Sequence, residues 1–321
     1  MRIASLLPVA TEIVCALGAR DALVGVSHEC DYPHGIGELP ALTSSRLAMP
    51  GSSAEIDRDV RNALQDALSL FAVDAERLAA LAPDVILTQD LCAVCAVAYE
   101  DVQRAVDAVL PTPATIVSLN PHCLADLWTD IRDVAVAIER VSQGESLIAT
   151  LQQRLAAIRT NTSTAGPGAK VVTVEWLRPV MLGGLWTPEL VRIAGGVPLG
   201  VEDGCKAPTV SHDALAALDP DVVVLKPCGY TVEQTLAERH VLPQALPWEQ
   251  WRAVRNGRVY VVDGSAYFNR SGPRLVDSAE IVAMLLNPES NTAALSRYGA
   301  DVYRINTALK AESLCPQATR A

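Results

Sequence analysis

The sequence predicts an α/β protein of two similar Rossmann-like lobes, each with a parallel sheet, joined by one long helix. Residues 78–87 (LAALAPDVIL) recur almost letter for letter as residues 215–224 (LAALDPDVVV). Each copy is typical of a helix end, a Pro-Asp turn and a buried strand. Between the copies, apolar residues at three- and four-residue steps over 122–160 indicate a helix in which Gly144 is the one strong breaker. Two such lobes leave a cleft between them, which favours ligand binding as the first functional hypothesis.

The first predicted lobe, residues 1–121, alternates short apolar runs with helical patterns. After the first strand, a turn at Pro8 leads into a helix that ends at Gly18. The long irregular stretch 28–53 is rich in Pro, Gly and Ser and is the kind of loop that carries function. Strands are expected at 2–7, 23–27, 84–88 and 115–119, and further helices at 74–81 and 96–109. This alternation predicts a parallel sheet wrapped by helices.

The second predicted lobe, residues 170–287, repeats the alternation after the predicted spine helix at 122–160. Strands are expected at 170–175, 221–225 and 258–262, and helices at 188–194, 211–218 and 273–286. The remaining tail, residues 288–321, is polar and is expected to form a peripheral helix at most.

Composition limits the partners and the compartment. The net charge is −11, and the sequence has no cluster of Lys and Arg that could form a nucleic-acid surface. No apolar run is long enough to span a membrane. The first residues carry no secretory leader, so a cytoplasmic monomer is expected, or a periplasmic one if an upstream leader has been removed. Eight cysteines spread through a large domain are expected to be reduced thiols.

Several strings in the chain resemble those of a known family. They are the opening SLLPVATEI, the later LVGVSHECDYP, the two Pro-Asp turns, and the ending GRVYVVD followed by FNRSGPRL. In this order and spacing, over residues 1–286, the chain resembles the substrate-binding proteins of cobalamin and iron-chelate uptake. That family has two lobes joined by one long helix. The resemblance implies non-catalytic binding of a corrinoid or another metal chelate between the lobes, and an ABC transporter permease as the protein that receives it.

By this resemblance, ligand contacts come from loops of both lobes. A flat macrocycle is held by apolar area and aromatic faces, with an Arg for its polar groups. The implied contacts are Tyr32, Ser45, Arg46, Leu91, Cys92, Trp186, Phe268 and Arg270.

Each of the aromatic and charged contacts has a plainer alternative. Tyr32 is equally well explained as a turn residue before Pro33, and Trp186 as a hydrophobic staple at a helix start. Arg270 has Asp263 and Asp277 as alternative partners.

The family also docks on its transporter through one acidic residue on each lobe. The matching positions here are Glu76 and Asp213, each beside one copy of the repeat. The alternative is an ordinary solvated helix face, and a chain without a leader would not meet a periplasmic transporter.

Sulfur near the predicted cleft suggests a second hypothesis. His28 and Cys30 follow one strand and Cys92 and Cys95 follow another, so all four are expected at the carboxyl edge of one sheet. Thiolates and an imidazole suit Zn²⁺ or Cu(I), which predicts, as the alternative, a cytoplasmic metal-binding or thiol-dependent protein. Packed, reduced thiols are the plainer interpretation.

An enzyme is not expected. The sequence contains no Gly-rich phosphate loop, no metalloprotease His pair and no nucleophile elbow. No cofactor is predicted as a requirement; a corrinoid, or zinc or copper, is expected only as a bound ligand.

Overall fold

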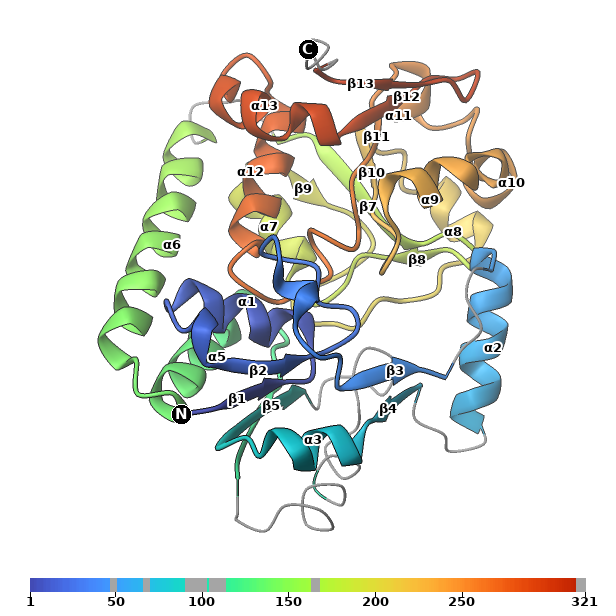
Figure 1. The fold of residues 1–321 in the computed structure, drawn as a ribbon. Coiled ribbons are helices and arrows are strands. Elements are labelled where there is room, and N and C mark those ends of the chain that lie inside the picture. The colour runs from blue at the N-terminus through green and yellow to red at the C-terminus, as the bar shows by residue number, and fades with distance from the viewer. Residues whose placement is uncertain (47–50, 66–69, 90–102, 104–113, 163–167, 316–321) are drawn as a thin grey trace, which may run out of the picture. The chain divides into compact units, whose positions relative to one another are not determined.

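The computed structural model describes residues 1–46, 51–65, 70–89, 103, 114–162 and 168–315. Its chain divides into two compact units (Figure 1). Unit 1 consists of Met1–Gly51, Glu55–Leu151 and Ser271–Pro273. Unit 2 consists of Ser52–Ala54, Gln152–Arg270 and Arg274–Ala321. The predicted α/β class with parallel sheets is confirmed, and the predicted lobes 1–121 and 170–287 fall largely within the two units.

Unit 1 is built on a four-stranded parallel sheet in the order β2-β1-β5-β6. Its strands are β1 (Ile3–Ser5), β2 (Leu23–Val26), β5 (Val85–Gln89) and β6 (Thr115–Leu119). Around it lie the helices α1 (Pro8–Ala16), α3 (Ala75–Leu81) and α5 (Leu124–Ala137), with α1 packed on α5. The central strands are apolar and buried, as parallel strands covered on both faces must be.

The stretch 28–53 of unit 1 contains more regular structure than a loop. The strand β3 (Thr43–Ser45) pairs antiparallel with β4 (Phe71–Val73). The helix α2 (Ser53–Gln65) begins at the last residue of this stretch. The stretch also contains the short 3-10 turn η2 (Ile36–Glu38), whereas a second one, η1 (Arg20–Ala22), lies before β2.

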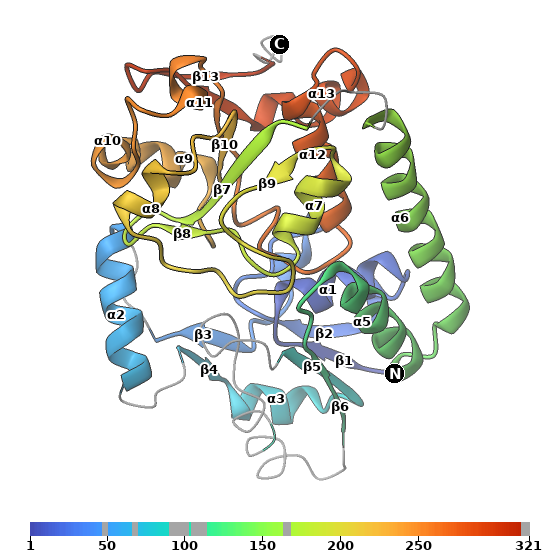
Figure 2. The same cartoon turned by 180° about the vertical axis from the view of Figure 1, so that it is seen from behind.

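Unit 2 contains a seven-stranded sheet whose centre repeats the strand order of unit 1. The parallel strands β9 (Val197–Pro198), β7 (Lys170–Trp176), β10 (Val222–Leu225) and β11 (Val259–Val261) lie in that order. Three antiparallel strands extend the sheet: β8 (Met181–Leu182), β12 (Tyr303–Ile305) and β13 (Ala311–Ser313). The view from behind shows α7 (Thr187–Ile193) and α12 (Leu275–Leu286) side by side next to β9 and β7 (Figure 2).

The other helices of unit 2 are short. They are α8 (His212–Ala216), α9 (Val232–Ala237), η3 (Arg239–Val241), α10 (Leu242–Ala245), α11 (Arg252–Arg255), α13 (Thr292–Tyr298) and η4 (Gly299–Asp301). The tail predicted as peripheral therefore belongs to the core of unit 2, because β12 joins the sheet and buries Ile305 completely.

The repeat has the same backbone geometry in both units. Ala82 and Asp219, at the ends of α3 and α8, both adopt the left-handed conformation, with φ of 40° and 37°. The next acidic residue then caps the start of a neighbouring strand. Asp84 Oδ2 accepts the backbone N–H of Arg2 at 2.7 Å, and Asp221 Oδ2 accepts that of Lys170 at 2.9 Å. The two copies lie in separate sheets, as the duplicated architecture requires.

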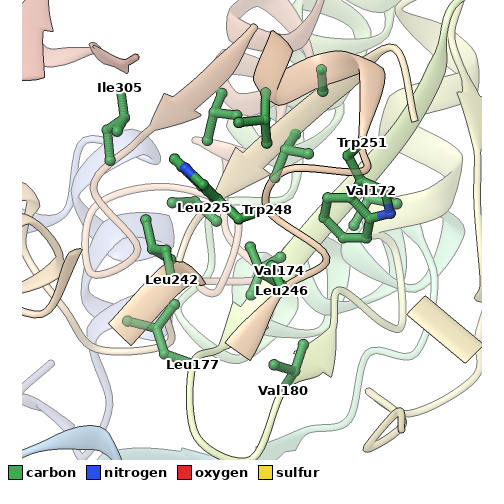
Figure 3. Close-up of a cluster of buried hydrophobic side chains, with 14 of the residues drawn as sticks. Val172, Val174, Leu177, Val180, Leu225, Leu242, Leu246, Trp248, Trp251 and Ile305 are labelled. Carbon is green, nitrogen blue, oxygen red and sulfur yellow. The ribbon is translucent and has the colours of Figure 1, made fainter. Parts of the chain in front are cut away.

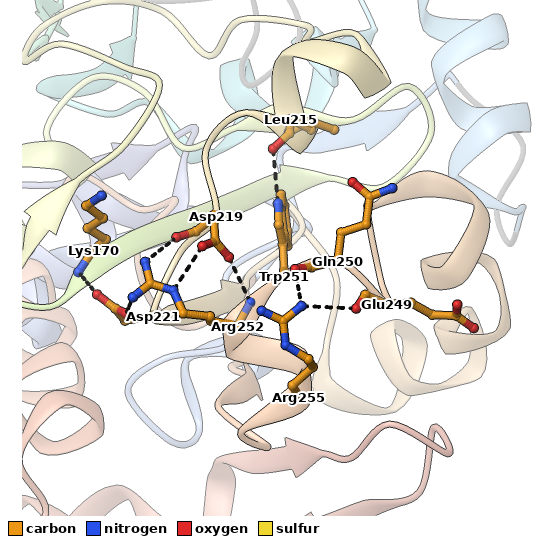
Figure 4. A network of polar contacts seen from close by, with 9 residues as sticks. All are labelled: Lys170, Leu215, Asp219, Asp221, Glu249, Gln250, Trp251, Arg252 and Arg255. Carbon is orange, nitrogen blue, oxygen red and sulfur yellow. Dashed lines mark hydrogen bonds and ion pairs between the residues drawn. The ribbon is translucent and has the colours of Figure 1, made fainter.

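In unit 2, additional polar contacts hold the second copy of the repeat (Figure 4). Arg252 donates its backbone N–H and its Nε to the carboxylate of Asp219, both at 2.9 Å, and its Nη1 lies 3.2 Å from Asp221. These contacts hold the pKa of Asp219 below its usual range, the backbone N–H contributing most. Unit 1 lacks this network because Ala82 stands where unit 2 has Asp219.

The predicted spine at 122–160 is two helices rather than one. After α5 ends, Glu139 adopts the left-handed conformation at φ 57°, and α6 (Val141–Thr162) begins. Gly144, the breaker expected from sequence, lies inside α6, where a Cβ would meet the Cβ of Ala135 at 2.7 Å. The glycine thus permits close packing of the two helices, and the break falls at Glu139 instead.

The core of unit 2 collects large apolar side chains from the sheet and from the segment 241–254 (Figure 3). Trp251 is completely buried there, and its Nε1–H donates to the carbonyl of Leu215 at 3.0 Å. Leu215 is the first residue of the second copy of the repeat, so this hydrogen bond joins the core directly to the repeated segment.

Candidate ligand-binding site

The carboxyl end of β2 in unit 1 carries the predicted residue His28. Its Nδ1 lies 2.7 Å from Thr43 Oγ1 on β3, and its ring centroid lies 5.5 Å from that of Phe71 on β4. Partial desolvation lowers the pKa of His28. The antiparallel pair of β3 and β4 thus holds the ring at the edge of the sheet where α/β proteins bind ligands.

Cys30, the second predicted metal ligand of this segment, is in a different environment. Its side chain is buried, and its Sγ lies 3.2 Å from the hydroxyl of Thr11 on α1. Among the residues that the structure describes, no group of three or more His, Cys, Asp or Glu side chains could hold a metal ion. Leu91, Cys92 and Cys95, and the helix expected at 96–109, lie outside the described residues apart from Gln103.

Three predicted ligand contacts of unit 1 are exposed on loops. Tyr32 is 47% exposed, and both Ser45, at the end of β3, and Arg46 are exposed. The backbone N–H of Arg46 donates to the carbonyl of Leu70 at 2.9 Å, which fixes the chain where it leaves β3.

Trp186 and Phe268 of unit 2 are packed inside the unit, at 5% and 1% exposed. Trp186 Nε1–H donates to the carbonyl of Phe268 at 2.6 Å, and the N–H of Phe268 donates to Ser278 Oγ at 2.9 Å. The geometry favours the packing alternative for both rings, because an indole whose N–H is already bonded to backbone fastens one segment to another. We therefore do not retain them as direct ligand contacts.

Arg270 is half-buried at the end of the loop that follows β11. Its Nη2 donates to Ser265 Oγ at 3.3 Å. Asp277, one of the partners considered for it, pairs with Arg154 on α6 at 2.5 Å. Arg270 remains the cationic candidate of unit 2.

Sequence reasoning missed a buried charged group at the carboxyl edge of the sheet in unit 2. Lys226 follows β10, and its side chain is completely buried. Its Nζ donates to Glu175 Oε2, near the end of β7, and to Asn269 Oδ1, both at 2.7 Å. A lysine directly after the apolar run VVVL was the available signal, since a buried Lys requires a partner.

Trp176, the last residue of β7, lies beside this group. Its Nε1–H is shared between the carbonyls of Ser53 and Arg178, each at 3.1 Å, and its ring meets that of Tyr230 edge-on at 5.2 Å. The ring is only partly buried. An aromatic surface therefore adjoins the charged group.

The two predicted docking residues occupy equivalent positions in the repeat. Glu76 and Asp213 are each the second residue of their helix, α3 and α8, and both are exposed. Their helices are capped in the same way, since Asp74 accepts the N–H of Arg77 at 2.9 Å and Ser211 accepts that of Ala214 at 3.4 Å. The duplication thus presents one carboxylate on each unit.

Two units of the same strand order, with polar and aromatic loops at the carboxyl edges of their sheets, define a substrate-binding protein of the α/β class. The chain belongs to the periplasmic binding protein family, whose model matches residues 3–266. It is therefore a binding protein and not an enzyme, as predicted, and the metal or thiol alternative is not favoured.

Known proteins resemble the chain over most of its length. A protein named vitamin B12-binding protein, from Vibrio cholerae serotype O1, is 24% identical over 290 residues, which cover 89% of this chain and 88% of the relative. The crystal structure of a periplasmic vitamin B12-binding protein of Vibrio cholerae matches with a TM-score of 0.63 at 21% identity, covering 89% of this chain and 96% of that one. A periplasmic heme-binding protein of the same organism matches with a TM-score of 0.68 at 19% identity, covering 90% and 99%.

The expectation of a cytoplasmic protein is wrong. The family is that of periplasmic binding proteins, and the solved relatives just described are periplasmic as well. The reasoning failed because it relied on the first residues of the sequence. In the described part of the chain, no helix combines the length and the apolar character that a membrane span needs.

Proposed function

We propose that the protein binds a corrinoid of the cobalamin type, without transforming it, and delivers it to an ABC transporter permease. The observation that carries this proposal is the similarity to vitamin B12-binding proteins over nearly nine tenths of both chains. The two repeated units, with loops at the carboxyl edges of their sheets, are consistent with that role.

In this proposal, each unit contributes part of the ligand site. Tyr32, Ser45 and Arg46 supply contacts from unit 1, and Arg270 supplies a cation from unit 2. An exposed aromatic face and a guanidinium suit a flat macrocycle with polar groups on its rim.

The proposed contact with the permease rests on Glu76 and Asp213. Both carboxylates are exposed and lie in the first turn of their helices. A pair of fixed negative charges, one on each unit, suits recognition by arginines of a partner.

Calorimetric titration of the purified chain with cyanocobalamin tests the proposal. We expect one ligand to bind per chain with a dissociation constant of about 1 μM or lower, equivalent to about −8 kcal/mol. Absence of saturable binding up to about 100 μM cyanocobalamin would contradict it.

The matched control is the double variant Glu76→Lys, Asp213→Lys. It should bind cyanocobalamin like the parent, because both side chains are solvated and lie outside the proposed ligand contacts. It should fail to support uptake through the cognate permease. Equal uptake with the parent and the variant would remove the docking role.

A further inference from the structure

The geometry points to Glu175 as a specificity-determining contact that selects a ligand rim carrying amide N–H donors over one carrying carboxylates. The inference rests on the proposed function, because it concerns which macrocycle that site accepts. It starts from the charged group at the carboxyl edge of the sheet in unit 2, where neighbouring strands β7 and β10 end close to Glu175 and Lys226.

The positive member of this group is turned entirely inward. Lys226 is 0% exposed, and its Nζ donates to Glu175 and Asn269 while lying 5.9 Å from the ring centroid of Phe268. Asn269 is fixed in turn, because its Nδ2 donates to the carbonyls of Lys226 and Gly264 at 3.0 and 2.9 Å. The ammonium thus offers no donor to the surface.

The negative member reaches the surface. The side chain of Glu175 is 24% exposed. Its Oε2 accepts Lys226 and, at 3.3 Å, the backbone N–H of Gly184, whereas its Oε1 has no hydrogen-bond partner among the described residues. This edge of the sheet therefore offers Glu175 Oε1 as a hydrogen-bond acceptor, and the ion pair with Lys226 fixes the carboxylate in place.

The loop beside the carboxylate is closely packed, which keeps the acceptor in place. A Cβ on Gly183 would lie 2.5 Å from Thr173 Oγ1, and one on Gly184 would lie 2.4 Å from the backbone N of Ala207. At both positions the neighbouring chain leaves no room for a side chain. The glycine pair is thus explained by close packing against Thr173 and the backbone of residues 205–207.

A fixed acceptor distinguishes the two classes of macrocycle that the relatives bind. The rim of a cobalamin carries amide groups, whose N–H donors can pair with Glu175 Oε1. The rim of a heme carries carboxylates, which are acceptors like Glu175 itself and repel it. A polar site rejects a ligand that leaves its polar groups unpaired far more strongly than an apolar site rejects a small change of shape.

The test compares the affinities of the full chain for cyanocobalamin and hemin in the parent and in two variants. Glu175→Met/Lys226→Met removes the acceptor together with the charge it pairs with, so no buried lysine is left unpaired. Glu233→Gln, which removes an exposed carboxylate on α9 of the same unit, is the matched control. Circular dichroism and thermal unfolding establish that each variant is folded before titration.

We expect the parent to bind cyanocobalamin at least about tenfold more tightly than hemin. The double variant should lose about tenfold or more in affinity for cyanocobalamin and none for hemin, whereas Glu233→Gln should stay within about threefold of the parent for both.

Three results would overturn the inference while leaving corrinoid binding intact. They are undiminished cyanocobalamin affinity in the double variant, an equal loss in Glu233→Gln, and preference of the parent for hemin. A parent chain that binds neither macrocycle would instead refute the proposed function, and this inference with it.

Discussion

Trp251→Ala is expected to lower the free energy of unfolding of unit 2 by about 3–5 kcal/mol. The indole is completely buried among the apolar side chains of the core, so its removal leaves a cavity that rigid strands cannot close. It also leaves the carbonyl of Leu215 without its donor. Urea unfolding followed by far-UV circular dichroism measures the loss.

Trp251→Phe separates the two causes. It keeps most of the apolar volume but removes the Nε1–H, so it should cost about 1–2 kcal/mol. If Trp251→Ala were no more destabilising than Trp251→Phe, the indole would not be the central core residue of unit 2 that the structure indicates.

Asp130→Asn is expected to stabilise the protein at pH 8 by about 2–4 kcal/mol. Asp130 lies on α5 at 5% exposed, and its Oδ2 has no hydrogen-bond partner among the residues that the structure describes. Burial, together with the nearby carboxylates of Asp133 and Asp126, raises its pKa to about 7, although the backbone N–H of Asn120 acts in the opposite direction. An amide at this position has no charge to desolvate.

The pH dependence has a defined sign. The unfolded chain ionises this carboxyl from about pH 4, whereas the folded chain keeps it protonated to about pH 7. The parent should therefore lose stability relative to Asp130→Asn as the pH rises from about 4 to 8, and the two should be nearly equal below pH 4. Glu233→Gln, at an exposed carboxylate on α9 of unit 2, is the control. A constant difference between parent and Asp130→Asn across this range would contradict the account.

The sequence predicted the parallel sheets well because their strands are continuous buried apolar runs with Pro-Asp turns before them. The strand at 115–119 and the helix over 75–81 were predicted to within a residue. The repeat could be recognised in the sequence because the left-handed turn and the capping Asp require similar residues in both copies.

Other elements depend on contacts that a single sequence does not display. The break between α5 and α6 falls at Glu139, a residue with no intrinsic preference for a left-handed turn. The strands β12 and β13 are short and half polar, and they are strands because β11 offers an edge to pair with.

Within the candidate site, the predicted residues differ in burial in a way that the sequence does not display. Tyr32 and Arg46 are exposed, whereas Trp186 turns inward because the carbonyl of Phe268 provides a partner for its N–H. Glu175 and Lys226 were missed because they lie far apart in sequence, and only the pairing of β7 with β10 brings them together.

Hydrogen exchange measured with and without cyanocobalamin tests most directly the claim that the duplicated sheets present one ligand site through the loops at their carboxyl edges. Binding should slow exchange in residues 27–33 and 43–46 of unit 1 and in residues 175–186 and 264–270 of unit 2, and leave β12 and β13 unchanged. Protection confined to a single unit, or found only away from these edges, would contradict the account.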